Sequence, residues 1–256
     1  MTRVLLLALL AAAEFARAAD PALDARRSGY DFMTPQVQAM QRDDASNPAM
    51  LWVGEGAAIW DQKAGASERA CADCHGAATN SMRGVAARYP AFDSATQRPI
   101  DLRGRINQCR VERQRASAFA AESQPLLSIE SFVALQSRGL PITPPADARL
   151  QPARERGAKL FRQRVGQLDF SCAQCHDDHA GGRLAGSTIP QAHPTGYPLY
   201  RLEWQGLGSL QRRLRGCMTG VRAEPYAYGA PELIELELYL AQRAADMKVD
   251  APAVRP

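Results

Sequence analysis

Two copies of the pattern Cys-x-x-Cys-His restrict the folds open to this chain more than any other feature of its sequence. In this pattern two thiols bind the vinyl groups of one haem, and the adjacent histidine becomes an axial ligand of the iron. One copy could be chance or a redox pair, but two in 256 residues favour two covalently bound haem c groups. The copies are CADCH (Cys71, Cys74 and His75) and CAQCH (Cys172, Cys175 and His176).

Residues 1–19 are predicted to be a secretory signal peptide. Arg3 provides a positive start, an apolar run covers residues 4–13, and the triplet Ala-Arg-Ala at 16–18 has the form of a cleavage site. The apolar run is too short to span a bilayer, and no other stretch is a better candidate. We therefore expect an exported protein of the bacterial periplasm that does not cross a membrane.

The charge of the chain gives no sign of a nucleic acid partner. The formal net charge is +4, and nearly all of the 31 basic residues are arginines. A lysine-rich tail and interleaved aromatic and basic residues, which are typical of nucleic acid binding, are both absent from the sequence.

The sequence around the two motifs repeats. An apolar helix start, GAAIW at Gly56 and GAKLF at Gly157, precedes each motif by the same 15 residues. After each motif a lone cysteine follows an arginine by four positions, as in RINQC and RLRGC. The similar segments 129–138 and 234–243 are then expected to be helices.

This repeat predicts a mainly α fold of two tandem cytochrome c-type domains. We place the first domain, with the first haem, at residues 20–145 and the second at residues 146–256. The proline-rich segment 139–152 lacks periodicity and is expected to be the linker between them.

The second axial ligand of the first iron can be narrowed by elimination. Between His75 and the linker there is no histidine or lysine, which leaves Met82 and Cys109. Met82 follows His75 by only 7 residues, a short span for a chain that must reach the opposite haem face. We therefore expect Cys109 to bind as a thiolate.

The second domain offers more choices, and the internal repeat decides between them. Cys217 corresponds to Cys109, whereas Met218, at a spacing where many small cytochromes carry an axial methionine, corresponds to Arg110. We favour Cys217, with Met218 as its rival and a disulfide between Cys109 and Cys217 as a further alternative. Two histidines, expected on the surface or in loops, complete the candidates: His179 and His193.

Cys217 lies among several arginines. Positive charge favours its thiolate form, and guanidinium groups bind oxyanions in a bidentate manner. Arg213 precedes Cys217 by four residues, so a helix would place both on one face. The pattern indicates a site where a sulfur oxyanion such as thiosulfate lays its sulfonate on Arg213 and its outer sulfur near Cys217. Alternatively the arginines form a solvated face or contact haem propionates, which we favour for Arg212 and Arg215.

These segments resemble a known family. RGRINQCR, CAQCH and YRLEWQGLGSLQRRLRGCMTGVRAEPYAYGAPELIELELYL are similar to the A subunits of the SoxAX cytochromes of bacterial sulfur oxidation, and the likeness covers nearly the whole mature chain. It implies a periplasmic heterodimer with a small monohaem cytochrome, SoxX. It also implies L-cysteine S-thiosulfotransferase activity, in which thiosulfate is joined oxidatively to a cysteine of the carrier SoxYZ. Two electrons then leave through the haems to a soluble cytochrome c.

The resemblance also implies roles for single positions. Cys217 matches the active-site cysteine, which is an axial ligand of the second haem and is found as a persulfide. Arg213 matches the substrate-binding arginine. The remaining matches are Cys71, Cys74, His75 and Cys109 for the first haem and Cys172, Cys175 and His176 for the second.

Three other functions stay open at this point. A plain dihaem electron-transfer cytochrome would use Met218 as axial ligand and have a higher potential. A thiosulfate dehydrogenase would form tetrathionate without a carrier protein. A disulfide-linked binding protein without haem is the most distant alternative.

Overall fold

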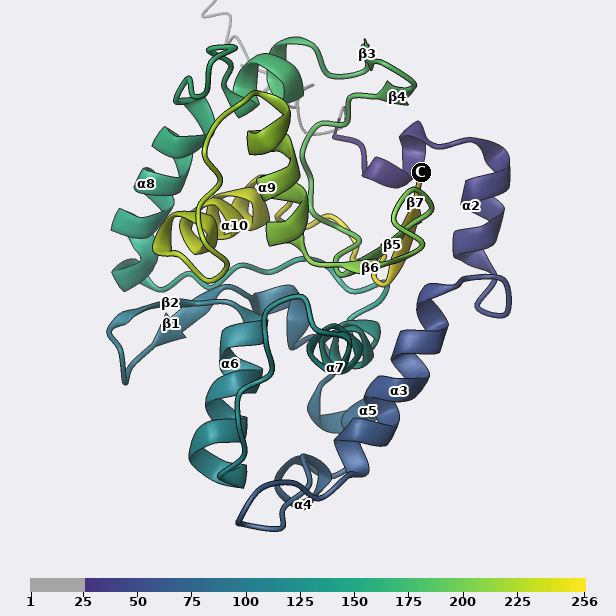
Figure 1. Ribbon diagram of the computed structural model, residues 1–256, viewed down its shortest axis with the longest axis vertical. Coiled ribbons are helices and arrows are strands. Elements are labelled where there is room, and N and C mark those ends of the chain that lie inside the picture. Colours follow the sequence, from purple (N-terminus) through teal and green to yellow (C-terminus); the bar gives the residue numbers. More distant parts are fainter. Residues whose placement is uncertain (1–25) are drawn as a thin grey trace, which may run out of the picture.

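The computed structural model describes residues 26–256, and the predicted signal peptide lies outside them. Figure 1 shows two helical lobes, each built on a crossed pair of helices. In the first lobe α3 (Ala49–Asp61) packs on α7 (Gln124–Leu135), and in the second α8 (Gln151–Arg162) packs on α10 (Pro231–Arg243). None of the described helices has the length and apolar composition needed to cross a membrane. The expected mainly α fold of two repeated units is confirmed.

Shorter elements complete the molecule. The first lobe adds α4 (Ala72–His75), α5 (Ala78–Ser81), η2 (Ala86–Arg88), β1 (Ala91–Asp93), β2 (Arg98–Ile100), α6 (Leu102–Cys109) and the π-helical turn η3 (Arg110–Gln114). The second adds η4 (Ala148–Leu150), the π-helical turn η5 (Gln174–Asp178), β3 (Arg183–Leu184), β4 (Ser187–Thr188), β5 (Leu199–Arg201), β6 (Gly206–Gly208) and α9 (Leu210–Gly220). The two chain ends contribute η1 (Gly29–Phe32), α2 (Pro35–Arg42) and β7 (Ala253–Arg255).

Each helix pair crosses at a glycine of the repeat. A Cβ built on Gly56 of α3 would lie 2.1 Å from the carbonyl oxygen of Ser128 in α7. One built on Gly157 of α8 would lie 2.1 Å from the carbonyl oxygen of Glu235 in α10. Because both distances are far shorter than a van der Waals contact, the backbones reach this separation only where no side chain intervenes.

The two crossings show which residue of α7 corresponds to which residue of α10 in the repeat. This correspondence differs from the one expected from the sequence. The alignment of similar letters paired Ile129 with Ile234, but it is wrong by two residues. Leu236 is buried at the position of Ile129, whereas Ile234 is only half-buried. The buried side chains correspond as Leu126 with Leu233, Ile129 with Leu236 and Val133 with Leu240.

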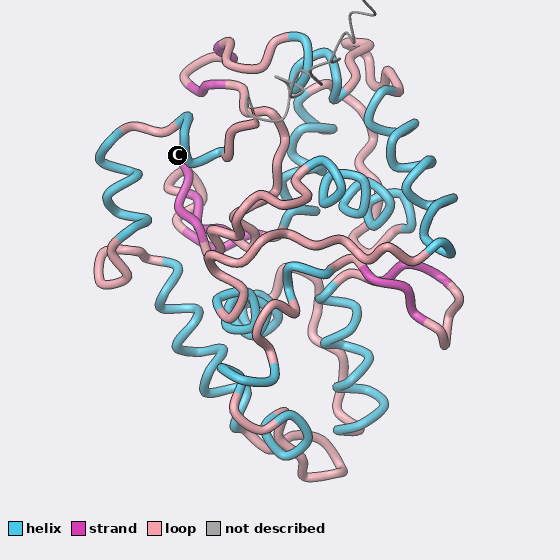
Figure 2. The backbone as a smooth tube through the Cα atoms, turned by 180° about the vertical axis from the view of Figure 1, so that it is seen from behind, coloured by secondary structure: helices cyan, strands magenta, loops and turns pink. Residues whose placement is uncertain are grey.

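A short hairpin in each lobe leads into the helix that carries the lone cysteine. β1 pairs with β2, and β5 with β6, in the same antiparallel register. The next residue then caps a helix: Asp101 accepts from the amide of Gly104 in α6, and Ser209 accepts from that of Arg212 in α9. In the second lobe β7 adds in parallel to β5, giving the three-stranded sheet seen in Figure 2. The repeat therefore continues, residue for residue, into α6 and α9.

The two lobes meet through equivalent segments. The amide of Gly139 donates to the carbonyl of Val249 at 2.8 Å, and the amide of Asp246 donates to the carbonyl of Ile142 at 2.8 Å. Each bond is the counterpart of the other in the repeat. The first part of segment 139–152, expected to be a linker, is thus not a free connection, because backbone hydrogen bonds hold it against the second lobe.

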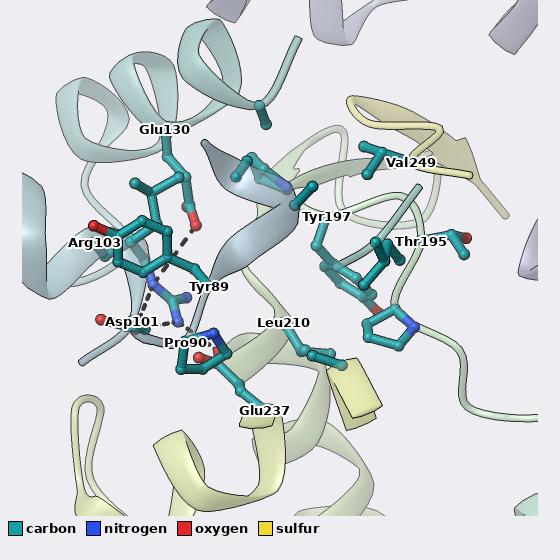
Figure 3. Close-up of a pocket in the computed structure, with 18 residues that line it drawn as sticks. Tyr89, Pro90, Asp101, Arg103, Glu130, Thr195, Tyr197, Leu210, Glu237 and Val249 are labelled. Atoms are coloured by element: carbon teal, nitrogen blue, oxygen red, sulfur yellow. Dashed lines mark hydrogen bonds and ion pairs between the residues drawn. The ribbon is translucent and has the colours of Figure 1, made fainter. Parts of the chain in front are cut away.

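A cavity of about 100 Å³ lies at this interface (Figure 3), and much of its wall consists of residues that the repeat makes equivalent. The two lobes therefore contact each other through equivalent surfaces. The equivalent pairs include Tyr89 with Tyr197, Leu102 with Leu210 and Glu130 with Glu237.

Arg103 is buried beside this cavity and faces an excess of carboxylates. Its guanidinium lies 2.6 Å from both Asp101 and Glu237, 3.9 Å from Glu130 and 4.0 Å from Glu122. Burial raises the pKa of Glu130 to about 8 and that of Glu237 to about 7, and the positive charge of Arg103 only partly opposes this. One guanidinium cannot neutralise the whole cluster, so protonation of a buried glutamate relieves it.

We predict that the Glu130→Gln variant loses less stability than the wild type as pH rises. A carboxyl whose pKa is raised on folding stabilises the fold below its unfolded pKa, and this contribution is lost as pH rises through the folded pKa. Between about pH 5 and pH 8 the wild type should lose on the order of 2 kcal/mol more than the variant. Chemical denaturation of the haem-loaded proteins measures this, with the exposed Glu155→Gln as control. Identical pH profiles for all three proteins would contradict it.

We also predict that the helix crossing of the first lobe does not tolerate one added methyl group. Gly56→Ala should destabilise the protein by about 1–3 kcal/mol, because the new Cβ collides with the backbone of α7. Gly54→Ala, on the same helix but with nothing within 4 Å of its Cβ, should be neutral or stabilising. Thermal or denaturant unfolding compares the pair, and equal effects would refute the role of the crossing.

Candidate functional site

The first Cys-x-x-Cys-His motif lies at the outer tip of the first lobe, on α4 (Figure 1, bottom). The amide of Ala70 donates to the Asp73 carboxylate at 2.8 Å and closes the turn that enters α4. The indole N–H of Trp60 donates to the carbonyl of Gly76 at 3.0 Å. The Trp60 ring centroid is 5.7 Å from that of His75. The end of α3 therefore positions the first histidine while leaving it exposed.

Cys109, the last residue of α6, reaches the same tip. It is close enough to Cys71 and Cys74 for their charges to interact. Met82, the competing ligand, instead packs against the apolar core of the first lobe together with Trp60. Burial raises the pKa of Cys109, and the positive charge of Arg105 only partly opposes this.

The second motif lies at the start of η5 and orients its histidine through the backbone. Cys172 and Cys175 are both half-buried. The Nδ1 atom of His176 lies 2.6 Å from the carbonyl oxygen of Pro190. A carbonyl only accepts, so Nδ1 carries a proton, and in the neutral imidazole Nε2 then keeps the lone pair that a metal needs.

Cys217, on α9, and His176 lie next to each other in the wall of a cavity of about 410 Å³. The thiol and the imidazole are within hydrogen-bonding distance of each other, and both side chains line this cavity. Arg213 lines it too, one helical turn before Cys217. The structure thus brings together the histidine, the lone cysteine and the arginine that the sequence analysis singled out.

The electrostatics of Cys217 differ from those of Cys109. Burial opposes ionisation of the Cys217 thiol, but the hydrogen bond from His176 and the positive charges of Arg213 and Arg201 outweigh it, so its pKa is lowered. The two lone cysteines occupy equivalent positions and have opposite pKa shifts. The second site therefore favours a thiolate that the first does not.

The rival candidates lie elsewhere. Met218 lines a separate surface hollow that Cys217 does not line. His179 is exposed, and His193 lies at the cavity wall, where its Nδ1 is 2.8 Å from the carbonyl oxygen of Arg27. All six cysteines are free, so the alternative of a Cys109–Cys217 disulfide is not borne out.

The sequence analysis missed Arg201, which is a charged residue of this cavity. Arg201, at the end of β5, lines the same cavity as Arg213 and Cys217. The sequence did contain a sign of this position. YPAFD at Tyr89 precedes the lone Cys109 by the same number of residues as YPLYR at Tyr197 precedes the lone Cys217. These stretches share only their first two letters, and the shared hairpin register is what makes them equivalent.

Haem c fits the donor sets of both lobes. Each lobe supplies two thiols one helical turn apart, as the two covalent links require. It also brings a histidine and a cysteine from distant segments to one place, as two axial ligands of one iron require. In the second lobe the pair lines a cavity, and the Pro190 carbonyl engages Nδ1 of His176, so Nε2 is the nitrogen available to a metal.

Comparison with known proteins agrees with this fit. The family described as SoxA/TsdA, cytochrome c domain, matches residues 55–142 and 156–249, one match in each lobe. The SoxA subunit of L-cysteine S-thiosulfotransferase from Rhodovulum sulfidophilum is 36% identical over 91% of this chain and 81% of its own. The equivalent subunit from Pseudaminobacter salicylatoxidans is 36% identical over 89% of this chain and 80% of its own. The crystal structure of SoxXA from P. pantotrophus matches with a TM-score of 0.87 and 33% identity, over 90% of this chain and 87% of that chain.

Proposed function

The chain belongs to the SoxA/TsdA cytochrome c family, and from this membership we propose that it is the haem-bearing subunit of an L-cysteine S-thiosulfotransferase. The observation that carries the proposal is a single cavity lined by His176, Arg213 and Cys217, with the thiol and the imidazole in contact. The relatives of this chain bear the name of that enzyme's subunit. The reaction would join thiosulfate to a cysteine of the SoxYZ carrier.

The proposal assigns two haem c groups to the chain. Cys71 and Cys74 would hold the first, with His75 and Cys109 as axial ligands. When bound, haem c supplies an electron acceptor next to the axial cysteine. The second group would be held by Cys172 and Cys175, with His176 and Cys217 as axial ligands.

The residues of the second site suit a sulfur oxyanion. Arg213 has no carboxylate partner among residues 26–256 and lies one turn from Cys217. Its guanidinium would hold the sulfonate of thiosulfate and direct the outer sulfur toward Cys217. Joining that sulfur to the carrier thiol breaks one S–H bond, forms one S–S bond and releases one proton and two electrons. A persulfide on Cys217 would place a further sulfur atom at the same point.

The partners follow from the same premise. A monohaem cytochrome of the SoxX type would form the heterodimer, as in the SoxXA structure, and a soluble cytochrome c would accept the electrons. These steps would take place in the periplasm, to which the predicted signal peptide would direct the chain. We keep the domain division near residue 145, between the two matched regions.

We predict two covalent haems per chain, and one in each motif variant. Replacing Cys172 and Cys175 by serine removes the two links of the second group and should leave one haem. Replacing Cys71 and Cys74 should likewise leave one. Intact mass of the denatured, exported protein counts the haems. Two haems retained in either double variant would be incompatible with this assignment.

We predict that Cys217→Met retains both haems and loses transfer of thiosulfate to the carrier, because methionine can ligate iron but cannot act as a nucleophile. Mass spectrometry of the carrier detects the thiosulfonate adduct. Met218→Leu is the matched control, since its side chain lies in the separate hollow, and it should keep both the haem spectrum and the transfer.

Two results would turn the assignment toward the alternatives. Full transfer by Cys217→Met, or a haem spectrum altered by Met218→Leu, would favour a plain electron-transfer cytochrome. Tetrathionate formed from thiosulfate without any carrier would identify a thiosulfate dehydrogenase.

A further inference from the structure

The two lobes differ in charge at one position of their shared hairpin. Asp93 ends β1 and Arg201 ends β5, and the strand registers make them equivalent, as they do Arg105 and Arg213 in the helices that follow. The arginine before each lone cysteine therefore faces an acid in the first lobe and a second arginine in the other.

In the first lobe the acid neutralises its neighbour. Asp93 lies 3.1 Å from the guanidinium of Arg105. Its carboxylate also accepts from the amide of Thr96 at 3.1 Å and from its hydroxyl at 2.7 Å. The side chain of Asp93 is 3% exposed, and this set satisfies it within the protein. No positive charge is left over for an incoming anion at this position.

In the second lobe both equivalent positions carry positive charge, and of the two only Arg201 has a carboxylate partner among the described residues, Glu203. The side chain of Arg201 is 9% exposed and its buried Nε has no hydrogen-bond partner in the structure. The charge of the nearby Arg213 opposes that of Arg201. Burying a guanidinium whose Nε has no partner next to a second guanidinium costs free energy, unless an anion binds both.

Two further arginines line the cavity, Arg183 and Arg255. Neither Glu203 nor Asp250 reaches the Nε of Arg201. Glu203 reaches Arg201 at 3.1 Å, but from the outside, where its own side chain is 53% exposed. One oxygen of Asp250 lies 3.3 Å from Arg255, and the other is buried without a hydrogen-bond partner. The Nε of Arg201 stays free despite both carboxylates.

We propose that Arg201 and Arg213 together form a two-guanidinium oxyanion site, in which Arg201 binds the sulfonate of the substrate from the side opposite the helix. The identity of the substrate as thiosulfate rests on the proposed function, whereas the binding of an oxyanion rests on the geometry alone. The exchange of Asp93 for Arg201 then makes oxyanion binding specific to the second lobe, although both lobes keep the arginine and the cysteine.

A haem propionate has the same chemistry as a free oxyanion and is the competing occupant. The two sources differ in what they affect. A free oxyanion bound by Arg201 appears as a dissociation constant and a KM. A propionate held by Arg201 appears in the haem, as a change of reduction potential or spectrum without any change in anion affinity.

The experiment measures thiosulfate binding to the oxidised, haem-loaded protein by calorimetry, with sulfate as competitor. Arg201→Gln should raise the dissociation constant for thiosulfate by about 10- to 100-fold, which is the effect of losing one charge-assisted hydrogen bond. Arg201→Lys, which keeps the charge without the planar fork, should be intermediate. Haem content, potential and spectrum should be unchanged, and in the transfer assay KM should rise more than kcat falls.

Arg212→Gln is the matched control. It neighbours Arg213 on α9, but its guanidinium lies over the Trp204 ring, 4.1 Å from the centroid, and it does not line the cavity. Binding and turnover should stay at wild-type values. An equal loss in the Arg212 and Arg201 variants would reduce the effect to general surface charge and overturn the proposal.

The remaining outcomes separate this inference from the function on which it builds. Thiosulfate binding that depends on Arg201, in a protein that transfers nothing to the carrier, would sustain the anion site and reject the transferase. Transfer at wild-type KM by Arg201→Gln would reject the anion site and leave the transferase in place. A shifted haem potential with unaltered anion affinity would assign Arg201 to the propionate and overturn the proposal.

Discussion

The close crossing of two helices at a glycine is the contact on which each lobe depends. Gly56 and Gly157 let one helix backbone touch the carbonyl of the next, and this separation fixes where the haem motif leaves the first helix. The loops then return at a matching place: a Cβ on Gly65 or Gly166 would again meet backbone, that of the turns after α6 and α9. The motif and the lone cysteine are therefore held near each other by backbone contacts, without large side chains between them.

Within this shared frame, small differences give the lobes different chemistry. The first lone cysteine lies beside an arginine that an aspartate neutralises, and its pKa is raised. The second lies in a cavity that two arginines line, Arg201 and Arg213, and its pKa is lowered. The lowered pKa of Cys217 comes first from its hydrogen bond with His176 and then from Arg213, and Arg201, at the position of Asp93, adds to it. A fold built twice can therefore specialise one copy without moving its backbone.

The sequence predicted what depends on local patterns. The helices expected near residues 129–138 and 234–243 and the grouping of Arg213 with Cys217 follow from spacing, and the structure contains both. The predicted correspondence of α7 with α10 in the repeat was wrong by two residues. It followed the similarity of the sequence at Ile234, whereas the true correspondence is defined by the helix crossing. Arg201 was missed because its counterpart in the first lobe is the acidic Asp93, and two such different residues are not recognised as equivalent from the sequence. The pairing of segment 139–142 across the lobes depends on distant residues, which no local pattern reveals.

The buried Arg103 shows what it means that these two lobes share one chain. Its equivalent in α9 is Gln211, and both reach the carboxylate of Asp101, at 2.6 Å and 3.2 Å. In a dimer of identical subunits every group near the symmetry axis appears twice, so two guanidiniums would have to share that space. A single chain is free of this rule, because each half mutates separately. Covalent fusion thus permits an odd charge at a self-complementary contact, an arrangement closed to any symmetric ancestor.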